Sequence, residues 1–387
     1  MASELAFVMI NPYPISKSRT GGIIARYLAR TDLNFVAARM FGPGNDLVRE
    51  YADIVRRAEP ATETNALIAD YILRAYAPSA ATGKRRRVML LLFEGEDAIQ
   101  KIWDVTGSAT MKWGSGQTVR DTYGDYILND DGSVRYFEPA VLVAPTMTRA
   151  ARTLHLWAKH SEKDGGLIED AMDLGDNPDV QRTLVILKPD NFWSRSLRPG
   201  SIIDLLSSAG LRIIGVKKFS MTVAQAEEFY GPVKQSLAEK FKEFGAGRVA
   251  SALTRELGFA VPDTCVMDLC DRLGPIFANI QFETIVKFMT GYKPSECPTE
   301  DHNVHGKEEC LAMVYSGVDA VNKIRTLLGT TDPSKALPGS VRHEFGRDIM
   351  VNAAHASDSP ESARRELGII QVGQDSIKPL VDQYYPV

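Results

Sequence analysis

An internal repeat constrains the fold of this chain more than any other feature of its sequence, because two copies of one pattern are expected to adopt one fold twice. Residues 90–107, LLLFEGEDAIQKIWDVTG, match residues 311–329, LAMVYSGVDAVNKIRTLLG, around a shared G-x-D-A-x-x-K-I-x-x-x-x-G pattern. An arginine stands thirteen residues after the closing glycine of each copy, at Arg120 and Arg342. This equal spacing indicates a duplicated domain.

The starts of the two copies also agree, since residues 6–51 run parallel to residues 183–230. Each predicts an apolar strand, a loop, an amphipathic helix and a second strand. The runs VILK and RIIGVKKF are short, β-branched and bounded by Pro or Gly, which favours strands, whereas SIIDLLSSAG has helical spacing and ends at a glycine. Such an alternation predicts an α/β or α+β sandwich.

The segment between the copies is polar, acidic and rich in glycine, as linkers are. We therefore predict a first domain over residues 1–165, a linker over residues 166–181 and a second domain over residues 182–387. Two insertions, near residues 231–281 and 292–309, interrupt the second copy, and the first of them has the pattern of extra helices.

The net charge and the hydropathy of the chain argue against several classes of protein. A net charge of −4 from 45 basic and 49 acidic residues argues against a general nucleic-acid or membrane-surface binder. No run approaches the roughly 20 apolar residues of a membrane span, and the N-terminus lacks the pattern of a signal peptide. We expect a cytoplasmic protein.

The cysteines are too few and too unevenly placed for a disulfide scaffold. Cys297, His302, His305 and Cys310 are residue types that zinc prefers, but their spacing is not the usual paired one. A polar surface loop is the simpler interpretation, and a metal site stays open as the alternative.

His355 is the candidate catalytic residue of the second copy. The preceding GRDIMV predicts a strand, Ser359 is a good helix N-cap, Pro360 suits the first turn, and Gly368 suits the helix end. His355 is therefore expected between a strand end and a helix start, where unpaired backbone N–H groups favour anions. Glu366 is spaced to bond an imidazole nitrogen and fix its tautomer.

Three basic residues of the same copy, Lys188, Arg325 and Arg342, stand at element junctions. Together they would neutralise a polyphosphate if the fold brings them together.

The second copy resembles the nucleoside diphosphate kinase family. The resemblance covers residues 182 to 380, minus the insertions, and is carried by LVILKPD, KIRTLLGTTDP, LPGSVR and NAAHASDSPESARRE. It implies two tandem ferredoxin-like domains with antiparallel sheets, and transfer of the γ-phosphoryl group of ATP to a nucleoside diphosphate by a ping-pong mechanism. The resemblance also implies Mg²⁺ that arrives with the nucleotide, no metal ligands of the protein's own, and a homo-oligomer.

The family's site residues map onto this sequence one by one. The resemblance makes His355 the nucleophile, supported by Ser357 and Glu366. It implies that the remaining matched residues contact the nucleotide or line the transfer site. They are Lys188, Tyr230, Arg325, Thr331, Arg342 and Asn352, with Phe282 and Ile349 beside the base.

The first copy departs from this pattern. Asn11 replaces the lysine, Trp103 replaces the first arginine, and PAVLVAPTMTRAARTLHLW has no histidine in the signature position, although Arg120 and Tyr51 are retained. We expect an inactive domain that acts as an intramolecular partner. Two alternatives to the kinase remain: a nucleotide-binding scaffold or regulator with little turnover, and a phosphotransferase that uses histidines of other proteins.

Overall fold

The structure, a computed structural model, describes residues 3–110, 115–171, 177 and 179–386. It divides into two compact units. The first comprises Met1–Phe219 and Cys310–Val387 and contains both repeats, and the second comprises Ser220–Glu309. No helix of the described residues is both long enough and apolar enough to cross a bilayer.

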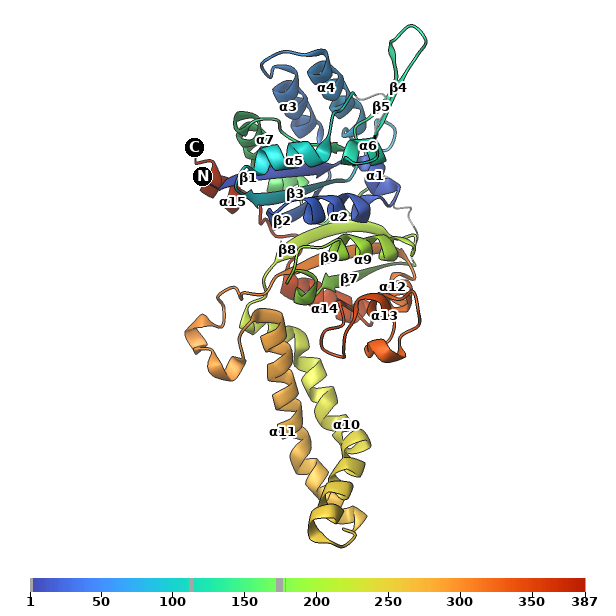
Figure 1. Cartoon of the computed structure of the whole chain (residues 1–387), viewed down its shortest axis with the longest axis vertical. Helices are drawn as coiled ribbons and strands as arrows, with labels where there is room; N and C mark the ends of the chain where they lie inside the picture. Colours follow the sequence, from blue (N-terminus) through green and yellow to red (C-terminus); the bar gives the residue numbers. More distant parts are fainter. Residues whose placement is uncertain (1–2, 111–114, 172–176, 178, 387) are drawn as a thin grey trace. The chain divides into compact units, whose positions relative to one another are not determined.

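The N-terminal half of the first unit is built from an antiparallel sheet with helices (Figure 1). Its strands are β1 (Glu4–Ile10), β2 (Asn34–Phe41), β3 (Val88–Gly95), β6 (Val141–Leu142) and the separate β4–β5 hairpin (Asp125–Leu128, Val134–Glu138). Its helices are α1 (Pro12–Ser16), α2 (Thr20–Arg30), α3 (Asn45–Arg56), α4 (Glu63–Ala75), α5 (Ala98–Thr106), α6 (Val119–Tyr123), α7 (Met147–Lys159) and α8 (Ser161–Asp164).

The C-terminal half repeats this order. Its strands are β7 (Val180–Leu187), β8 (Arg212–Phe219), β9 (Cys310–Val318) and β10 (Ala354–Ala356). Its helices are α9 (Arg198–Ser207), α12 (Ala320–Leu328), α13 (Val341–Phe345), α14 (Pro360–Ile370) and α15 (Lys378–Tyr384), with 3₁₀ turns at Pro189–Asn191 (η1) and Pro333–Lys335 (η4).

Within the described residues, eight strands form one sheet in the order β10-β7-β9-β8-β2-β3-β1-β6, and every pairing in it is antiparallel. Each half contributes four strands, whose order places its first and third strands at the centre, as in a ferredoxin-like sheet. The halves join where Arg39 of β2 pairs with Lys217 of β8, each the sixth residue of its strand. The predicted fold of two tandem ferredoxin-like domains is confirmed.

A close helix contact accompanies this strand pairing. Helix α2 packs on α9, its counterpart in the other half. A Cβ atom at Gly21 would overlap the carbonyl oxygen of Gly200, and one at Gly200 would overlap the carbonyl oxygen of Gly21. Equivalent residues thus meet across the junction, which is the arrangement of a two-fold symmetric dimer within one chain.

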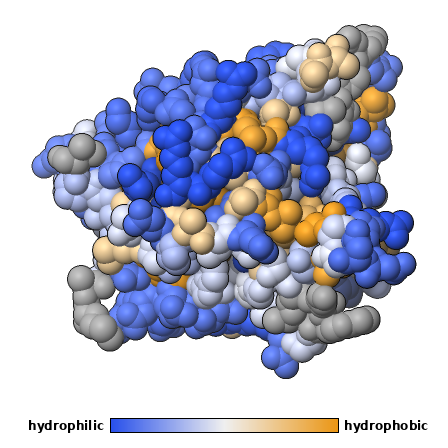
Figure 2. All heavy atoms as spheres, turned by 90° about the horizontal axis from the view of Figure 1, so that it is seen from above, coloured by the Kyte–Doolittle hydropathy of each residue, from blue (hydrophilic) through white to orange (hydrophobic). Residues whose placement is uncertain are grey.

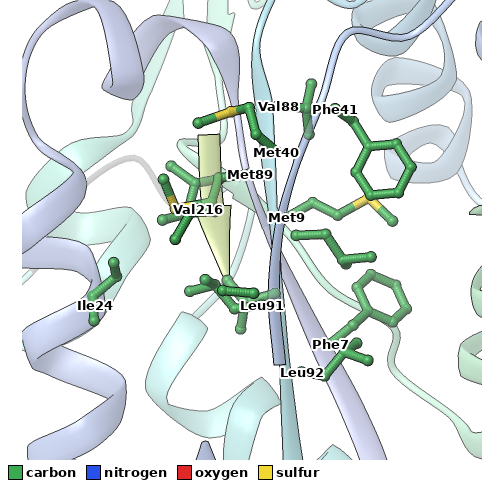
Figure 3. Close-up of a cluster of buried hydrophobic side chains, with 14 of the residues drawn as sticks. Phe7, Met9, Ile24, Met40, Phe41, Val88, Met89, Leu91, Leu92 and Val216 are labelled. Carbon is green, nitrogen blue, oxygen red and sulfur yellow. The ribbon is translucent and has the colours of Figure 1, made fainter. Parts of the chain in front are cut away.

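The core of the N-terminal half lies on both faces of its strands (Figure 3). Ile24 of α2 lies on the side of the sheet to which Leu91 points. Phe41 points to the opposite side and packs edge-to-face on Trp157 of α7, with 4.9 Å between ring centroids. Because both faces are covered, β3 is apolar and buried from Val88 to Phe93.

The segment between the halves is not a solvated tether where the structure describes it. The backbone N–H of Ile168 donates to the carbonyl of Ile214 (2.8 Å), Gly165 forms a bridge with Phe41, and Ile168 and Ala171 are buried. The predicted linker of residues 166–181 is therefore wrong at both ends: residues 166–171 pack on the sheet, and β7 already begins at Val180. Residues 172–176 and 178 lie outside the described residues.

The second unit is a helical hairpin, α10 (Val223–Leu257) and α11 (Asp263–Thr290), followed by 3₁₀ turns at Pro294–Glu296 (η2) and Thr299–Asp301 (η3). The first predicted insertion, near residues 231–281, lies within this hairpin, because α10 begins before it and α11 ends after it. Its own small core consists of Phe241, Val266 and Cys270.

The cysteine and histidine loop shows no metal geometry. A ring nitrogen of His302 lies 3.3 Å from the carbonyl of Cys297, and one of His305 lies 3.0 Å from the carbonyl of Ser220. Cys310 is buried in β9, in the other unit. No group of three or more His, Cys, Asp or Glu side chains that could hold a metal occurs among the described residues.

Candidate active site

His355 is the central residue of β10, an edge strand, where it pairs with Ile186 of β7. The strand prediction for GRDIMV was wrong, because Asp348 turns that segment. Its carboxylate accepts bonds from the backbone N–H groups of Met350 (2.9 Å) and Val351 (2.8 Å). This local side-chain bonding competes with strand pairing, and the strand forms three residues later, around the histidine.

The helix after His355 begins as predicted. Ser359 caps α14 by accepting a bond from the N–H of Ser362 (3.0 Å), and Pro360 occupies the first turn. Gly368 does not end the helix. It lies inside α14, which runs to Ile370 and ends at Gln371 with a left-handed φ of 51°.

Glu366 holds the imidazole. Its Oε2 lies 3.0 Å from Nε2 of His355 and accepts a bond from the Ser357 hydroxyl (2.7 Å). The carboxyl of Glu366 is buried, and when ionised it can only accept. Nε2 must then be the protonated ring nitrogen, which places the lone pair of neutral His355 on Nδ1.

Ser357 connects this pair to the sheet. Its hydroxyl oxygen accepts from the N–H of Leu184 (3.3 Å) on β7, and its own backbone N–H donates to the Leu184 carbonyl (3.1 Å). The orientation of Glu366, and through it of the histidine, is therefore fixed by a strand of the core.

Lys188 stands directly after β7 and is half-buried. Its Nζ donates to Oδ1 of Asn352 (2.7 Å) and to the carbonyl of Met350 (3.3 Å). Burial, and then the positive charge of Arg342, lower the pKa of Lys188 to about 8. The amide of Asn352 in turn donates to the carbonyls of Thr331 (3.1 Å) and Ile349 (2.8 Å), which joins four predicted site residues in one network.

Arg342 is positioned by two backbone carbonyls, one at the end of α12 and one in the histidine's own strand. Its guanidinium donates to the carbonyls of Gly329 (2.9 Å) and Ala354 (3.1 Å). Burial, and then the positive charge of Arg325, lower its pKa to about 10. The positive charges of Lys188, Arg325 and Arg342 thus repel one another. An anion bound among them would reduce this repulsion.

A hydrogen-bond network in the loop after β7, which was not predicted from the sequence, supports the backbone next to the site. The Asn191 amide donates to the carbonyls of Lys188 (2.9 Å) and Ala353 (2.6 Å), and Arg198 bridges Asn191 (2.8 Å) and Asp190 (2.5 Å). The polar run KPDN in the sequence could have predicted this network, because polar groups in a buried loop need hydrogen-bond partners.

Two predicted residues belong to the helical hairpin. Tyr230 and Phe282 are both buried within that unit, and the ammonium of Lys234 lies 4.9 Å from the ring centre of Phe282. In the first unit Ile349 is 64% exposed. The predicted roles of Tyr230, Phe282 and Ile349 stay predictions.

The two halves can be compared residue by residue. Arg120 donates to the carbonyls of Gly107 (2.9 Å) and Val141 (3.2 Å), the same two backbone positions that Arg342 contacts in its own half. Val141 and Leu142 pair with β1 as Ala354 and His355 pair with β7. By this register the position of the histidine is occupied by Leu142, and that of Glu366 by Thr153.

Comparisons with known proteins find one family. A family model described as nucleoside diphosphate kinase matches residues 181–246 and 299–374. Curated proteins called nucleoside diphosphate kinase from Campylobacter hominis and Helicobacter pylori (strain Shi470) are 30% and 31% identical over 196 and 195 residues. The matches cover 51% and 50% of this chain and 98% of each relative. A solved structure of the Aquifex aeolicus nucleoside diphosphate kinase is 28% identical, with a TM-score of 0.31, over 51% of this chain and 98% of that one.

Proposed function

Since this chain belongs to the nucleoside diphosphate kinase family, we propose that its second half transfers the γ-phosphoryl group of a nucleoside triphosphate to a nucleoside diphosphate through phospho-His355. The single observation that supports this most strongly is the bond between Nε2 of His355 and the buried Glu366. It leaves Nδ1 as the nucleophilic nitrogen and prepares a negative charge for the imidazolium that forms on phosphorylation.

The reaction would proceed in two half-reactions. Nδ1 of His355 attacks the γ-phosphorus of the triphosphate, the N–P bond forms, and the bond from phosphorus to the β-γ bridging oxygen breaks to release a nucleoside diphosphate. A second diphosphate then attacks with a terminal β-oxygen, and the histidine leaves with its lone pair. Atoms and charge balance without a further reactant.

The cations supply electrostatic stabilisation. Phosphoryl transfer depends chiefly on positioning and on compensation of charge at the transferred group. Arg325 and Arg342 would bind phosphate oxygens, and Thr331 would add a hydroxyl. Lys188, held by Asn352, would meet the phosphate chain and the ribose 3′-hydroxyl.

Magnesium would arrive as part of the substrate. Such an ion keeps phosphate and water ligands rather than a cage of protein carboxylates. The bound ion would neutralise charge on the phosphates. We also propose a cytoplasmic enzyme whose chains associate, since its four cysteines are free thiols and the family is oligomeric.

The first half would be an inactive partner domain. The two domain copies are then the first half, β1 to α8, and the second half, which begins with β7 at Val180. Only the second retains the nucleophile and the lysine. The strand junction at Arg39 and Lys217 supports a structural role for the first copy, because removing it would expose an edge strand.

Labelling separates the kinase from its alternatives. The purified full chain is incubated with γ-labelled MgATP, and unlabelled GDP is then added. We expect acid-labile label on the protein and its quantitative transfer to GDP, which yields labelled GTP. We expect no label on His355→Ala, and normal label on the control His305→Ala, whose histidine lies in the other unit. Binding of ATP without labelling would support a scaffold, and label that passes to another protein's histidine but not to GDP would support the third alternative.

A further inference from the structure

A cavity of about 580 Å³ lies in the N-terminal half, between α3, α4, α5 and α7. This volume is in the range of sites for small organic ligands. The face of the molecule that carries α3 and α4 is mostly hydrophilic, with hydrophobic side chains gathered in its middle (Figure 2). The cavity is open to solvent, since exposed residues such as Glu59 and Asp104 belong to its lining, so a ligand could enter it.

The cavity occupies the position of the active site in the other half. Its lining includes the counterparts of four residues of the C-terminal site: Leu142 for His355, Arg120 for Arg342, Trp103 for Arg325 and Thr153 for Glu366. The space for a ligand has therefore been kept although the reacting groups have been replaced.

The replacements make the cavity apolar. Phe7, Ile54, Ile68, Trp103 and Leu142 all face it. The counterpart of the lysine is no longer available for phosphates, since Asn11 is buried, donates to Glu138 (3.1 Å) and accepts from Tyr76 (2.7 Å). A polyphosphate would meet too little positive charge here, so a nucleoside triphosphate does not suit the site.

Two guanidinium groups remain in the lining. Arg120 is buried with its bonds directed to backbone carbonyls, and Arg149 of α7 donates only a 3.3 Å bond to the Asn65 amide oxygen. Neither forms an ion pair with a carboxylate in the part of the chain that the structure describes, and burial lowers the pKa of both, for Arg120 to about 10. The acidic members of the lining, Glu59 and Asp104, are exposed. Arg120 is buried and Arg149 is half-buried. Cations that are withdrawn from water without a counter-ion favour a bound anion.

We propose that this cavity binds an organic anion with an apolar body and a single charged head. The body lies against Trp103, Leu142 and Ile68, and the head, a carboxylate, sulfonate or phosphate, pairs with Arg149. The first half is then a ligand-binding domain beside a catalytic one. The site differs from the nucleotide site in both polarity and charge.

The experiment uses the intact chain and 8-anilinonaphthalene-1-sulfonate, which combines aromatic rings with one sulfonate. Its fluorescence is titrated with MgGDP present at saturation to occupy the C-terminal half. We expect one site per chain, and weakening of about tenfold in Arg149→Leu, as for loss of a charge-assisted bond. Arg152→Leu is the matched control, because Arg152 is an exposed arginine of the same helix.

A second variant tests the apolar part. Val143→Phe places a larger side chain in the lining and should abolish binding of the probe. Phosphoryl transfer to GDP should continue, and this activity shows that the variant is folded. Equal binding by Arg149→Leu and the wild type, loss of the probe when MgGDP is added, or absence of stoichiometric binding would each overturn the proposal. Displacement of the probe by octanoate or by phenyl phosphate identifies which head group the site prefers.

Discussion

Replacement of Glu366 by glutamine tests the central geometric argument. Glutamine has nearly the same shape as glutamate, so the packing of α14 should be retained, but the negative charge that accepts from His355 and Ser357 is lost. The amide can also turn its NH₂ toward the ring, which favours the tautomer with its lone pair on Nε2. Both effects weaken the nucleophile at Nδ1.

The expected loss follows from the two bonds involved. A hydrogen bond to a charged group contributes about 1.5–3 kcal/mol, and a neutral one about 0.5–1.5 kcal/mol. The difference, about 1–2 kcal/mol in the transition state, corresponds to a slowing of phosphorylation of about 5- to 30-fold. Glu366 is buried, so solvent screening should not reduce this figure much.

The assay is a single-turnover measurement of phosphohistidine formation from γ-labelled MgATP. Glu361→Gln is the matched control, because Glu361 is an exposed residue of the first turn of the same helix. Thermal unfolding should show that both variants are folded. If Glu366→Gln becomes phosphorylated as fast as the wild type and the control, the assignment of the tautomer to this bond is wrong.

Other predictions concern charge and packing. Since the pKa of Lys188 is about 8 in the free protein, its charged form prevails below that pH. Calorimetry should show GDP affinity falling above about pH 8 by up to about tenfold per pH unit, because binding then requires uptake of a proton. Lys188→Arg should give a flatter profile, since arginine stays charged, and a flat wild-type profile would contradict the prediction. Gly200→Ala should lower the free energy of unfolding by about 1–3 kcal/mol through overlap with Gly21, as measured by urea denaturation. Gly368→Ala, at an open position within α14, should raise it by about 0.5–1 kcal/mol, and equal effects of the two would refute the packing argument.

The repeat predicted more of this molecule than local patterns did. Equal spacing identified Arg120 and Arg342 as counterparts, and the structure gives them the same backbone partners. Local reasoning failed at GRDIMV, where the side chain of Asp348 bonds the backbone in place of a neighbouring strand. It also failed at Gly368, since a glycine inside a helix costs only about 1 kcal/mol and tertiary packing can offset that.

The contact between the halves could not be predicted from the sequence. Pairing of Arg39 with Lys217 joins residues 178 positions apart (217 − 39), and no periodicity specifies which edge of a sheet meets another. The cavity of the N-terminal half was missed for a related reason. The replacements at Asn11 and Trp103 and the missing histidine predicted an inactive domain, but not that the surrounding helices leave a cavity.

The junction of β2 with β8 also changes how this protein can vary. In a dimer of identical chains, every substitution at the two-fold axis occurs twice, and both partners must tolerate it. Here the two sides of the axis are separate stretches of one gene product, held together at an effective concentration that dilution cannot lower. Arginine can therefore face lysine across the axis, and one half can carry leucine at the position where the other carries histidine.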